Sequence, residues 1–250
     1  SLAHQIRTPL SAAMLYAGHL GTMAANDEVA SDSRFVRTHE RLMSQLHNME
    51  RQVRDMLTFA RGETVLDQQM TLRQIFDETR LASEVLMRSG TLVCQWQEVS
   101  DDWQLLCNKE SLIGALLNLL ENAVQNGGPS VQLRVGTEIV EQSGDKALVR
   151  ITVEDNGPGI AADKLEHVTE AFYTTRAQGT GLGLAVAQVV ARAHGGQFFI
   201  QNRSDSNGSQ VSGVCAGFVL PCNRCGSVTV TDEFDLSLTS QDIHAGEHNA

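Results

Sequence analysis

The sequence contains no apolar run close to the roughly 20 residues that a membrane-spanning helix needs. Residues 1–20 also lack the charged and then apolar order of a secretory signal peptide. We therefore predict that this segment makes no membrane contact and is cytoplasmic. Because the chain begins at Ser1 rather than at a methionine, we expect an N-terminal truncation, with any upstream region missing.

A basic cluster is also lacking. The 19 Lys and Arg residues are outnumbered by 30 Asp and Glu residues, which gives a net charge of −11. A nucleic-acid backbone would be repelled by this charge, so we predict no nucleic-acid partner.

Cysteine is scarce, with only five residues in a chain of 250. An odd number in a chain of this size does not indicate a disulfide framework, and it favours a reducing compartment. Cys222 and Cys225 form a lone CxxC pair. A zinc site there would need two further ligands that the sequence does not visibly supply, and the alternative is two free thiols.

Two stretches near the N-terminus have heptad spacing. From Leu42 the apolar residues follow at steps of 4, 3, 4, 3 and 4, as Leu46, Met49, Val53, Met56 and Ala60. The same alternation occurs earlier, at Ile6, Leu10, Ala13, Ala17, Leu20 and Ala24, before a polar break at residues 26–33. This pattern predicts two antiparallel helices. A second copy would bury the apolar seam in a four-helix bundle, whereas a monomeric hairpin docked on the rest of the chain is the alternative.

The pattern after Gly62 predicts a mixed α/β sandwich, so the whole chain is α+β. We expect helices over 72–87, 109–126 and 182–194, and strands over 92–97, 131–139, 147–154, 197–201 and 211–220. A glycine-rich connection over 155–181 is long enough to suggest function. The predicted domains are 1–63, 64–222 and a disordered acidic tail, 223–250, whose last 25 residues have five acids and no Lys or Arg.

The first candidate motif is His4-Gln5-Ile6-Arg7-Thr8-Pro9. On a helix His4 lies roughly 160° from Ile6, on the side away from the apolar seam. An exposed imidazole nitrogen can attack a phosphoryl group if the other nitrogen is held by a neighbour. The alternative is an ordinary surface histidine.

Three further motifs are polar or rich in glycine. Asn118 and Asn122 are four residues apart, so they share a helical face, and their amide oxygens suit a hard cation. Asp155 precedes Asn156-Gly157-Pro158-Gly159, where a carboxylate could accept a hydrogen bond from an adenine amine. Gly179-Thr180-Gly181-Leu182-Gly183 precedes a predicted helix, where free N–H groups attract phosphate. Capping or solvated asparagines are the alternative for the first of these motifs, and a plain turn is the alternative for the second. The glycine-rich loop is weak evidence when taken by itself.

In this order the motifs resemble those of sensor histidine kinases of two-component systems. The likeness covers residues 1 to about 222: a phosphoacceptor box at His4, an N box over 118–122, a G1 box over 155–159, an F-like segment over 172–176 and a G2 box over 179–183. The opening SLAHQIRTPLSAAMLYAGHL and the NAVQNGG ending of the N box are similar to kinases of the nitrogen-regulation type, especially those controlling flagellar genes.

The resemblance implies a Bergerat ATP-binding fold and a role for each motif. His4 would accept phosphate from ATP and pass it to an aspartate of a response regulator, and Arg176 would supply positive charge to the transferred group. Asn122 would be the principal Mg²⁺ ligand and Asp155 the acid that recognises adenine. Thr175, Arg176 and the loop from Gly179 to Gly183 would form a mobile lid over the phosphates. The implied ATP-site residues are Asn118, Asn122, Asp155, Gly157, Gly159, Thr175, Gly179, Thr180, Gly181, Leu182 and Gly183.

Two residues depart from the family pattern. Most relatives have an acid directly after the acceptor histidine, whereas Gln5 can orient the ring but cannot take its proton. Gln125 stands where many relatives have a lysine near the phosphates. Thr8 keeps the position at which relatives orient water for dephosphorylating the partner.

The resemblance therefore predicts a homodimeric histidine kinase using ATP and Mg²⁺, with a response regulator, such as a sigma-54-type activator, as partner. Two alternatives remain. A degenerate kinase acting as a scaffold or phosphatase would fit Gln5. An ATP-hydrolysing clamp resembling Hsp90, gyrase and MutL would share the nucleotide fold, although the HQIRTP hairpin argues against it.

Overall fold

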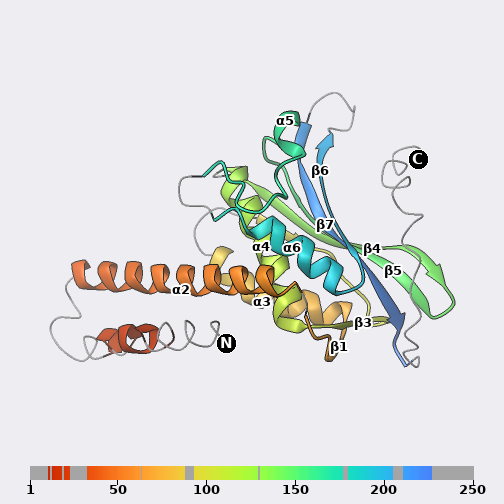
Figure 1. Cartoon of the computed structure of the whole chain (residues 1–250), viewed down its shortest axis with the longest axis horizontal. Coiled ribbons are helices and arrows are strands. Elements are labelled where there is room, and N and C mark those ends of the chain that lie inside the picture. The colour runs from red at the N-terminus through yellow and green to blue at the C-terminus, as the bar shows by residue number, and fades with distance from the viewer. Residues whose placement is uncertain are drawn as a thin grey trace.

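The structure is a computed structural model that describes residues 11, 13–18, 20–22, 33–62, 64–87, 93–128, 130–176, 180–204 and 211–226. A long helical hairpin precedes a seven-stranded mixed sheet, and helices cover one face of that sheet (Figure 1). The predicted order of helical hairpin and α/β sandwich is therefore confirmed. In the described part of the chain, no helix is long and apolar enough to span a membrane.

Helix α2 (Ser33–Arg61) is the second arm of the hairpin, and the described residues between 11 and 22 form helix in the first arm. The arms lie side by side (Figure 1), joined by a 2.6 Å hydrogen bond between His39 Nε2 and the carbonyl oxygen of the buried Ala17. A Cβ on Gly21 would lie 2.6 Å from His39 Cε1. A side chain at position 21 would therefore displace the His39 ring.

The apolar seam of α2 is not covered within one chain. Leu42, Met49 and Met56 are 45%, 53% and 51% exposed. The C-terminal end of the same helix is docked, since Phe59 packs against the core of the sandwich and α2 contacts α6. The hairpin is thus anchored at one end and presents an unpartnered apolar stripe along its middle.

The sheet has the strand order β1-β3-β7-β5-β4-β2, and β6 pairs with β7. The β2 and β4 strands are parallel, and every other pair is antiparallel. The five strands that we predicted are present, whereas the short strands β1 and β3 were missed. The strands are β1 (Gln68–Thr71), β2 (Val93–Trp96), β3 (Trp103–Cys107), β4 (Gln132–Ser143), β5 (Lys146–Asp155), β6 (Gln197–Ser204) and β7 (Val211–Arg224).

Three helices form the second layer of the sandwich: α3 (Leu72–Met87), α4 (Lys109–Gly127) and α6 (Gly183–Ala193). The short α5 (Ala162–Leu165) lies in the long connection after β5. Asn108 caps α4, because its side chain accepts a hydrogen bond from the Ser111 N–H at 3.0 Å. Fully buried side chains such as Leu116 and Phe218 fill the core, each contributing about 1.5–3 kcal/mol by burial.

The last strand extends beyond the predicted end of the domain, because β7 continues to Arg224 rather than ending at residue 220. The two nearby thiols point to different acceptors: Cys222 Sγ donates to the Ala147 carbonyl and Cys225 Sγ to that of Asp101. Among the described residues there is no cluster of three or more candidate metal ligands, so nothing there supports a zinc site. The acidic tail from residue 227 onward lies outside the described residues.

Candidate active site

A cavity of about 850 Å³ lies at the end of the sandwich that faces α2. Its walls come from α2, α4, the end of β5 with the connection that follows it, the start of α6, and strands β6 and β7. A volume of this size matches the pockets in which proteins bind small molecules and cofactors. Three of the four sequence motifs contribute to its lining.

Asp155 ends β5 and lies on the cavity wall, 8% exposed. Its Oδ1 accepts hydrogen bonds from the N–H groups of Gly157, at 2.8 Å, and Val214, at 3.2 Å. Burial raises the pKa of this carboxyl group, whereas the two N–H groups and Arg203 oppose that rise. The carboxyl group is thus fixed in orientation by the turn after β5 and by β7.

The turn after Asp155 is fastened to β6 by one side chain. Asn202 Oδ1 accepts from the Ile160 N–H and its Nδ2 donates to the Ile160 carbonyl, each at 2.7 Å. Gly159 has a φ of +77°, and a Cβ there would meet a Val211 methyl at 2.2 Å. A Cβ on Gly157 would lie 2.8 Å from Asp155 Oδ1. Both glycines of the motif therefore permit close packing around the carboxylate.

The two asparagines of α4 also line the cavity. Asn118 is 7% exposed and Asn122 is half-buried. Gly183, the first residue of α6, packs against both, since a Cβ there would lie 3.7 Å from Asn122 Nδ2 and 3.8 Å from Asn118 Cβ. The predicted shared face of the two amides is present, and the start of α6 is adjacent to it.

Arg176 reaches across the cavity to α4. Its Nη2 donates to Asn122 Oδ1 at 3.3 Å, and its Nη1 donates to Gln125 Oε1. Its backbone N–H donates to Thr174 Oγ1 at 3.1 Å. Burial lowers the pKa of Arg176, but a guanidinium stays charged at neutral pH. A held positive charge therefore lies beside the asparagine pair, and Thr175 lines the same wall.

The described part of the glycine-rich loop is braced by the F-like segment. Gly181 has a φ of +66°, and a Cβ there would lie 2.4 Å from the Phe172 carbonyl carbon. Its carbonyl accepts from the Phe172 N–H at 2.9 Å. Thr180 Oγ1 accepts from the Leu182 N–H at 3.3 Å, and the Leu182 side chain is buried in the core. Thr180, Gly181 and Gly183 line the cavity, whereas Leu182 anchors the loop.

The structure brings together most of the predicted site residues, but His4, Gln5, Thr8 and Gly179 lie outside the described residues. It also adds residues that we did not predict. Gln52 and Asp55 of α2 line the cavity, and Asn202 holds the turn. No local pattern marks these positions, because their role depends on which elements pack together.

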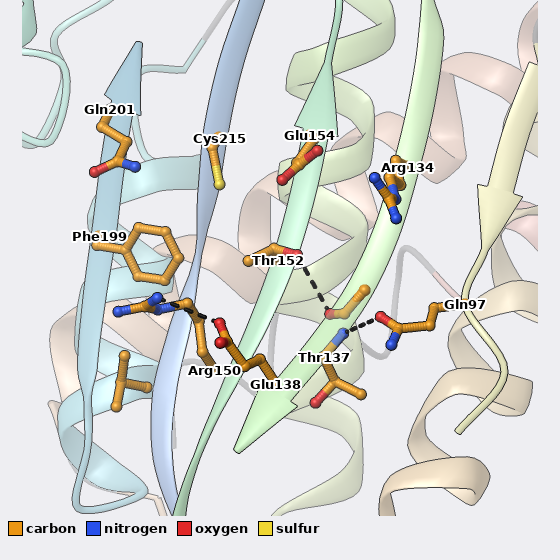
Figure 2. Close-up of a pocket in the computed structure, with 12 residues that line it drawn as sticks. Gln97, Arg134, Thr137, Glu138, Arg150, Thr152, Glu154, Phe199, Gln201 and Cys215 are labelled. Atoms are coloured by element: carbon orange, nitrogen blue, oxygen red, sulfur yellow. Dashed lines mark hydrogen bonds and ion pairs between the residues drawn. The ribbon is translucent and has the colours of Figure 1, made fainter. Parts of the chain in front are cut away.

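A second pocket, of about 330 Å³, lies on the face of the sheet away from the helices (Figure 2). Two of its charged groups are paired with each other: Arg150 Nη1 lies 3.5 Å from Glu138 Oε2, and the Arg150 guanidinium covers the Phe199 ring. Gln97 Oε1 accepts from the Thr137 N–H at 2.9 Å. None of the sequence motifs reaches this pocket, so the larger cavity is the candidate active site.

Comparisons with known families agree with this assignment. Residues 107–223 match the family described as "Histidine kinase-, DNA gyrase B-, and HSP90-like ATPase", and residues 1–65 match the "His Kinase A (phospho-acceptor) domain". A phosphoacceptor hairpin joined to this ATPase fold defines the class of histidine kinases. The chain belongs to that family.

Among curated proteins the chain is similar to the sensor protein kinase FleS of Pseudomonas aeruginosa, at 45% identity over 221 residues. The match covers 88% of this chain and 50% of FleS, so the chain spans half the length of that relative. The chain is also similar to the histidine-protein kinase AtoS of Escherichia coli, at 29% identity, covering 92% of this chain and 35% of AtoS.

Two solved histidine kinases share the fold. Full-length ShkA, crystallised with AMPPNP, matches with a TM-score of 0.64 at 22% identity, over 90% of this chain and 46% of that chain. ThkA, solved with the response regulator TrrA, matches with a TM-score of 0.56 at 20% identity, over 88% of this chain and 60% of that chain. Both matches extend over the hairpin as well as the sandwich, which supports the two-part architecture.

Proposed function

We propose that this chain is the catalytic core of an ATP-dependent protein-histidine kinase that phosphorylates His4 and passes the phosphoryl group to a response-regulator aspartate. The observation that carries the proposal is the cavity, in which a buried carboxylate and a pair of amides with an arginine occupy separate walls. This arrangement offers different chemistry to the two ends of a nucleotide, a base and a chain of phosphates.

At one end, Asp155 recognises adenine. Two backbone N–H groups already occupy Oδ1, so Oδ2 is the oxygen that accepts a hydrogen bond from the exocyclic amine. The turn held by Asn202 keeps the backbone close to the ring. Because Gly157 and Gly159 have no side chains, the base can lie against that backbone.

At the other end, the residues fit Mg²⁺ and phosphate. Mg²⁺ prefers oxygen ligands and usually retains waters and phosphate oxygens, so one or two amide oxygens suffice from the protein. Asn122 would hold the ion, with Asn118 beside it, and the bound ion would neutralise charge on the phosphates. Arg176, Thr175 and the N–H groups of the glycine-rich loop contact the phosphate oxygens.

His4 attacks the γ-phosphorus in line. A bond forms between an imidazole nitrogen and phosphorus as the bond to the β–γ bridging oxygen breaks, and ADP leaves. Gln5 orients the ring by its amide but accepts no proton, so the imidazole proton passes to solvent. Thr8 orients the water that later hydrolyses the phosphorylated partner.

The active unit is a homodimer, because the exposed seam of α2 needs a second copy to cover it. The likeness to FleS favours a partner that controls flagellar genes, with a sigma-54-type activator as the receiver protein. ThkA has been solved with a response regulator, and the same kind of partner fits here. We place this activity in the cytoplasm, where ATP is available.

The test is incubation of the purified chain with γ-labelled ATP and Mg²⁺. We expect protein-bound label that is labile to acid and stable to alkali, as a phosphoramidate is, and that is absent from His4→Ala. His244→Ala, a histidine change in the acidic C-terminal segment, is the matched control and should keep the label. Equal label in His4→Ala and the parent would overturn the assignment of His4.

A degenerate kinase acting as a scaffold or phosphatase is the second candidate, and Gln5 is the residue that favours it. Its expected result differs from that of the kinase: nucleotide binds, yet no label appears on the protein. Loss of phosphate from a prephosphorylated response regulator, dependent on Thr8, would then identify the phosphatase.

A further inference from the structure

The side chain of Arg176 is held at two points on one helix. Its two terminal nitrogens donate separately, Nη2 to Asn122 Oδ1 and Nη1 to Gln125 Oε1. The two acceptors are three residues apart on α4, so they project from the same side of the helix. The guanidinium is therefore fixed against α4 at the end of the cavity assigned to phosphate.

The two acceptors differ in what else they can bind. Asn122 Oδ1 is the oxygen that the proposed function gives to Mg²⁺, and an oxygen bound to a divalent cation is a poor acceptor for a second cation. Gln125 lines the same cavity and is exposed, and the proposed function gives its oxygen no metal to bind. When the metal binds Asn122, Gln125 is the acceptor that remains for Arg176.

We propose that Gln125 is a positioning residue that holds the Arg176 guanidinium at the phosphates while the Asn122 oxygen binds Mg²⁺. The inference rests on the proposed function and adds to it a role for a residue that departs from the family pattern. Gln125 acts through Arg176 and contacts no reacting atom, so it is not a catalytic residue.

The residue type at position 125 fits this role. A lysine there would repel Arg176 and could contact phosphate itself, so it would replace the arginine rather than hold it. A glutamate would hold the guanidinium but would also cancel its charge beside the phosphates. A neutral carboxamide accepts the hydrogen bond and leaves the full positive charge of Arg176 for the nucleotide.

The test is a double-mutant cycle in Mg·ATP affinity, measured by titration calorimetry on the whole chain. We expect Gln125→Met to weaken binding about five-fold, the loss of one exposed hydrogen bond to a charged group. In an Arg176→Met background the same change should have almost no further effect, because the group that Gln125 positions is gone. Thermal melting of each variant shows that the fold is retained.

Gln69→Met is the matched control, since Gln69 is an exposed glutamine of β1 outside the cavity. It should bind Mg·ATP like the parent. Full additivity in the cycle would mean that Gln125 acts independently of Arg176 and would overturn the inference. Tighter binding by Gln125→Met would also overturn it, because the hydrogen bond between Gln125 and Arg176 would then have to break before nucleotide binds.

The outcome separates this inference from the proposed function. If the parent binds Mg·ATP and the cycle is additive, the role of Gln125 is wrong and the nucleotide site stands. If the cycle is non-additive but His4 acquires no label, the positioning role stands and the kinase reaction is wrong. If the parent binds no Mg·ATP, both are overturned.

Discussion

Asp155 illustrates what one residue does in this site. Most aspartates are exposed, yet this one is 8% exposed and has no lysine or arginine in an ion pair with its carboxyl group among the described contacts. Its orientation comes from hydrogen bonds that two backbone N–H groups donate to it. The side-chain oxygen of an asparagine could accept the same two hydrogen bonds. Burial opposes this charge more strongly than Arg203 and the N–H groups favour it, so we infer that the carboxylate serves the ligand.

Asp155→Asn separates these two roles. The variant keeps an oxygen for the N–H groups of Gly157 and Val214, but it presents an NH₂ group to the adenine amine in place of an acceptor. We expect ATP affinity to fall about 50-fold with little change in the melting temperature. Titration calorimetry and thermal melting measure the two effects.

Asp77→Asn on the exposed face of α3 is the control and should bind ATP like the parent. Unchanged ATP affinity in Asp155→Asn would show that this carboxylate does not recognise the base.

At the scale of elements, the turn after β5 depends on a strand that is distant in sequence. Asn202 of β6 holds both the N–H and the carbonyl of Ile160 through its side-chain amide. No regular secondary structure pairs these backbone groups, so the amide replaces a strand. The position of the proposed adenine pocket is thus set by β6 as well as by its own glycines.

Asn202→Ala should loosen this turn. Both backbone groups of Ile160 lose their partner, and we expect about ten-fold weaker ATP binding, with a smaller effect on the melting temperature because the core is untouched. Asn202→Asp keeps an acceptor for the Ile160 N–H but turns a carboxylate oxygen toward the Ile160 carbonyl, so it should also bind ATP more weakly than the parent. Equal affinities for all three proteins in a calorimetric titration would contradict this role.

A second link joins α6 to the start of α4. His194 follows α6 and is 4% exposed; its Nε2 accepts from the Asn108 N–H at 3.1 Å and its Nδ1 donates to the Val190 carbonyl at 2.7 Å. The bond from Asn108 requires the neutral ring, because a protonated Nε2 cannot accept, whereas Nδ1 can donate to Val190 in either state. Burial lowers the pKa of His194 below its ordinary value.

This shift predicts a pH dependence of stability. The unfolded chain takes up a proton on this histidine at about pH 6.5, whereas the folded chain resists protonation, so stability falls as pH decreases below that value. The loss ends at the lowered pKa and cannot exceed about 1.4 kcal/mol for each pH unit. Urea unfolding of the parent and of His194→Gln between about pH 7 and about pH 5 measures it. A parent and variant with the same slope would exclude His194 as the cause.

At the scale of the whole molecule, the hairpin and the sandwich share one cavity. Gln52 and Asp55 of α2 line it together with α4 and the glycine-rich loop. Phe59 and Phe172 also meet edge to face, with ring centroids 6.4 Å apart, at the point where α2 reaches the F-like segment. A movement of α2 therefore changes the wall of this cavity directly.

The exposed seam predicts the oligomeric state. Glutamate at Leu42 and Met49 would place two charges in the buried core of a four-helix bundle, so Leu42→Glu/Met49→Glu should convert a dimer to a monomer. Analytical ultracentrifugation measures the mass. Arg41→Glu, an adjacent exposed position on α2, is the control and should remain dimeric. An unchanged mass for the double variant would favour the docked monomeric hairpin.

The sequence by itself determined the elements whose signals are local. Heptad spacing predicted α2, amphipathic periodicity predicted α3, and the glycine-rich motifs marked the cavity walls, because these patterns depend on neighbours in the chain. The short strands β1 and β3 were missed because four or five residues carry too little periodicity. Their pairing with each other and with β7 makes them strands.

Only the tertiary structure decided which groups meet. Asn202 lies 42 residues from Ile160, Arg176 lies 54 from Asn122, and Val214 lies 59 from Asp155. Such contacts form because β5 lies beside β7 in the sheet and because α6 packs against α4. A sequence pattern gives each residue its chemistry, but the distance between two residues depends on the packing of the whole core, which no local pattern contains.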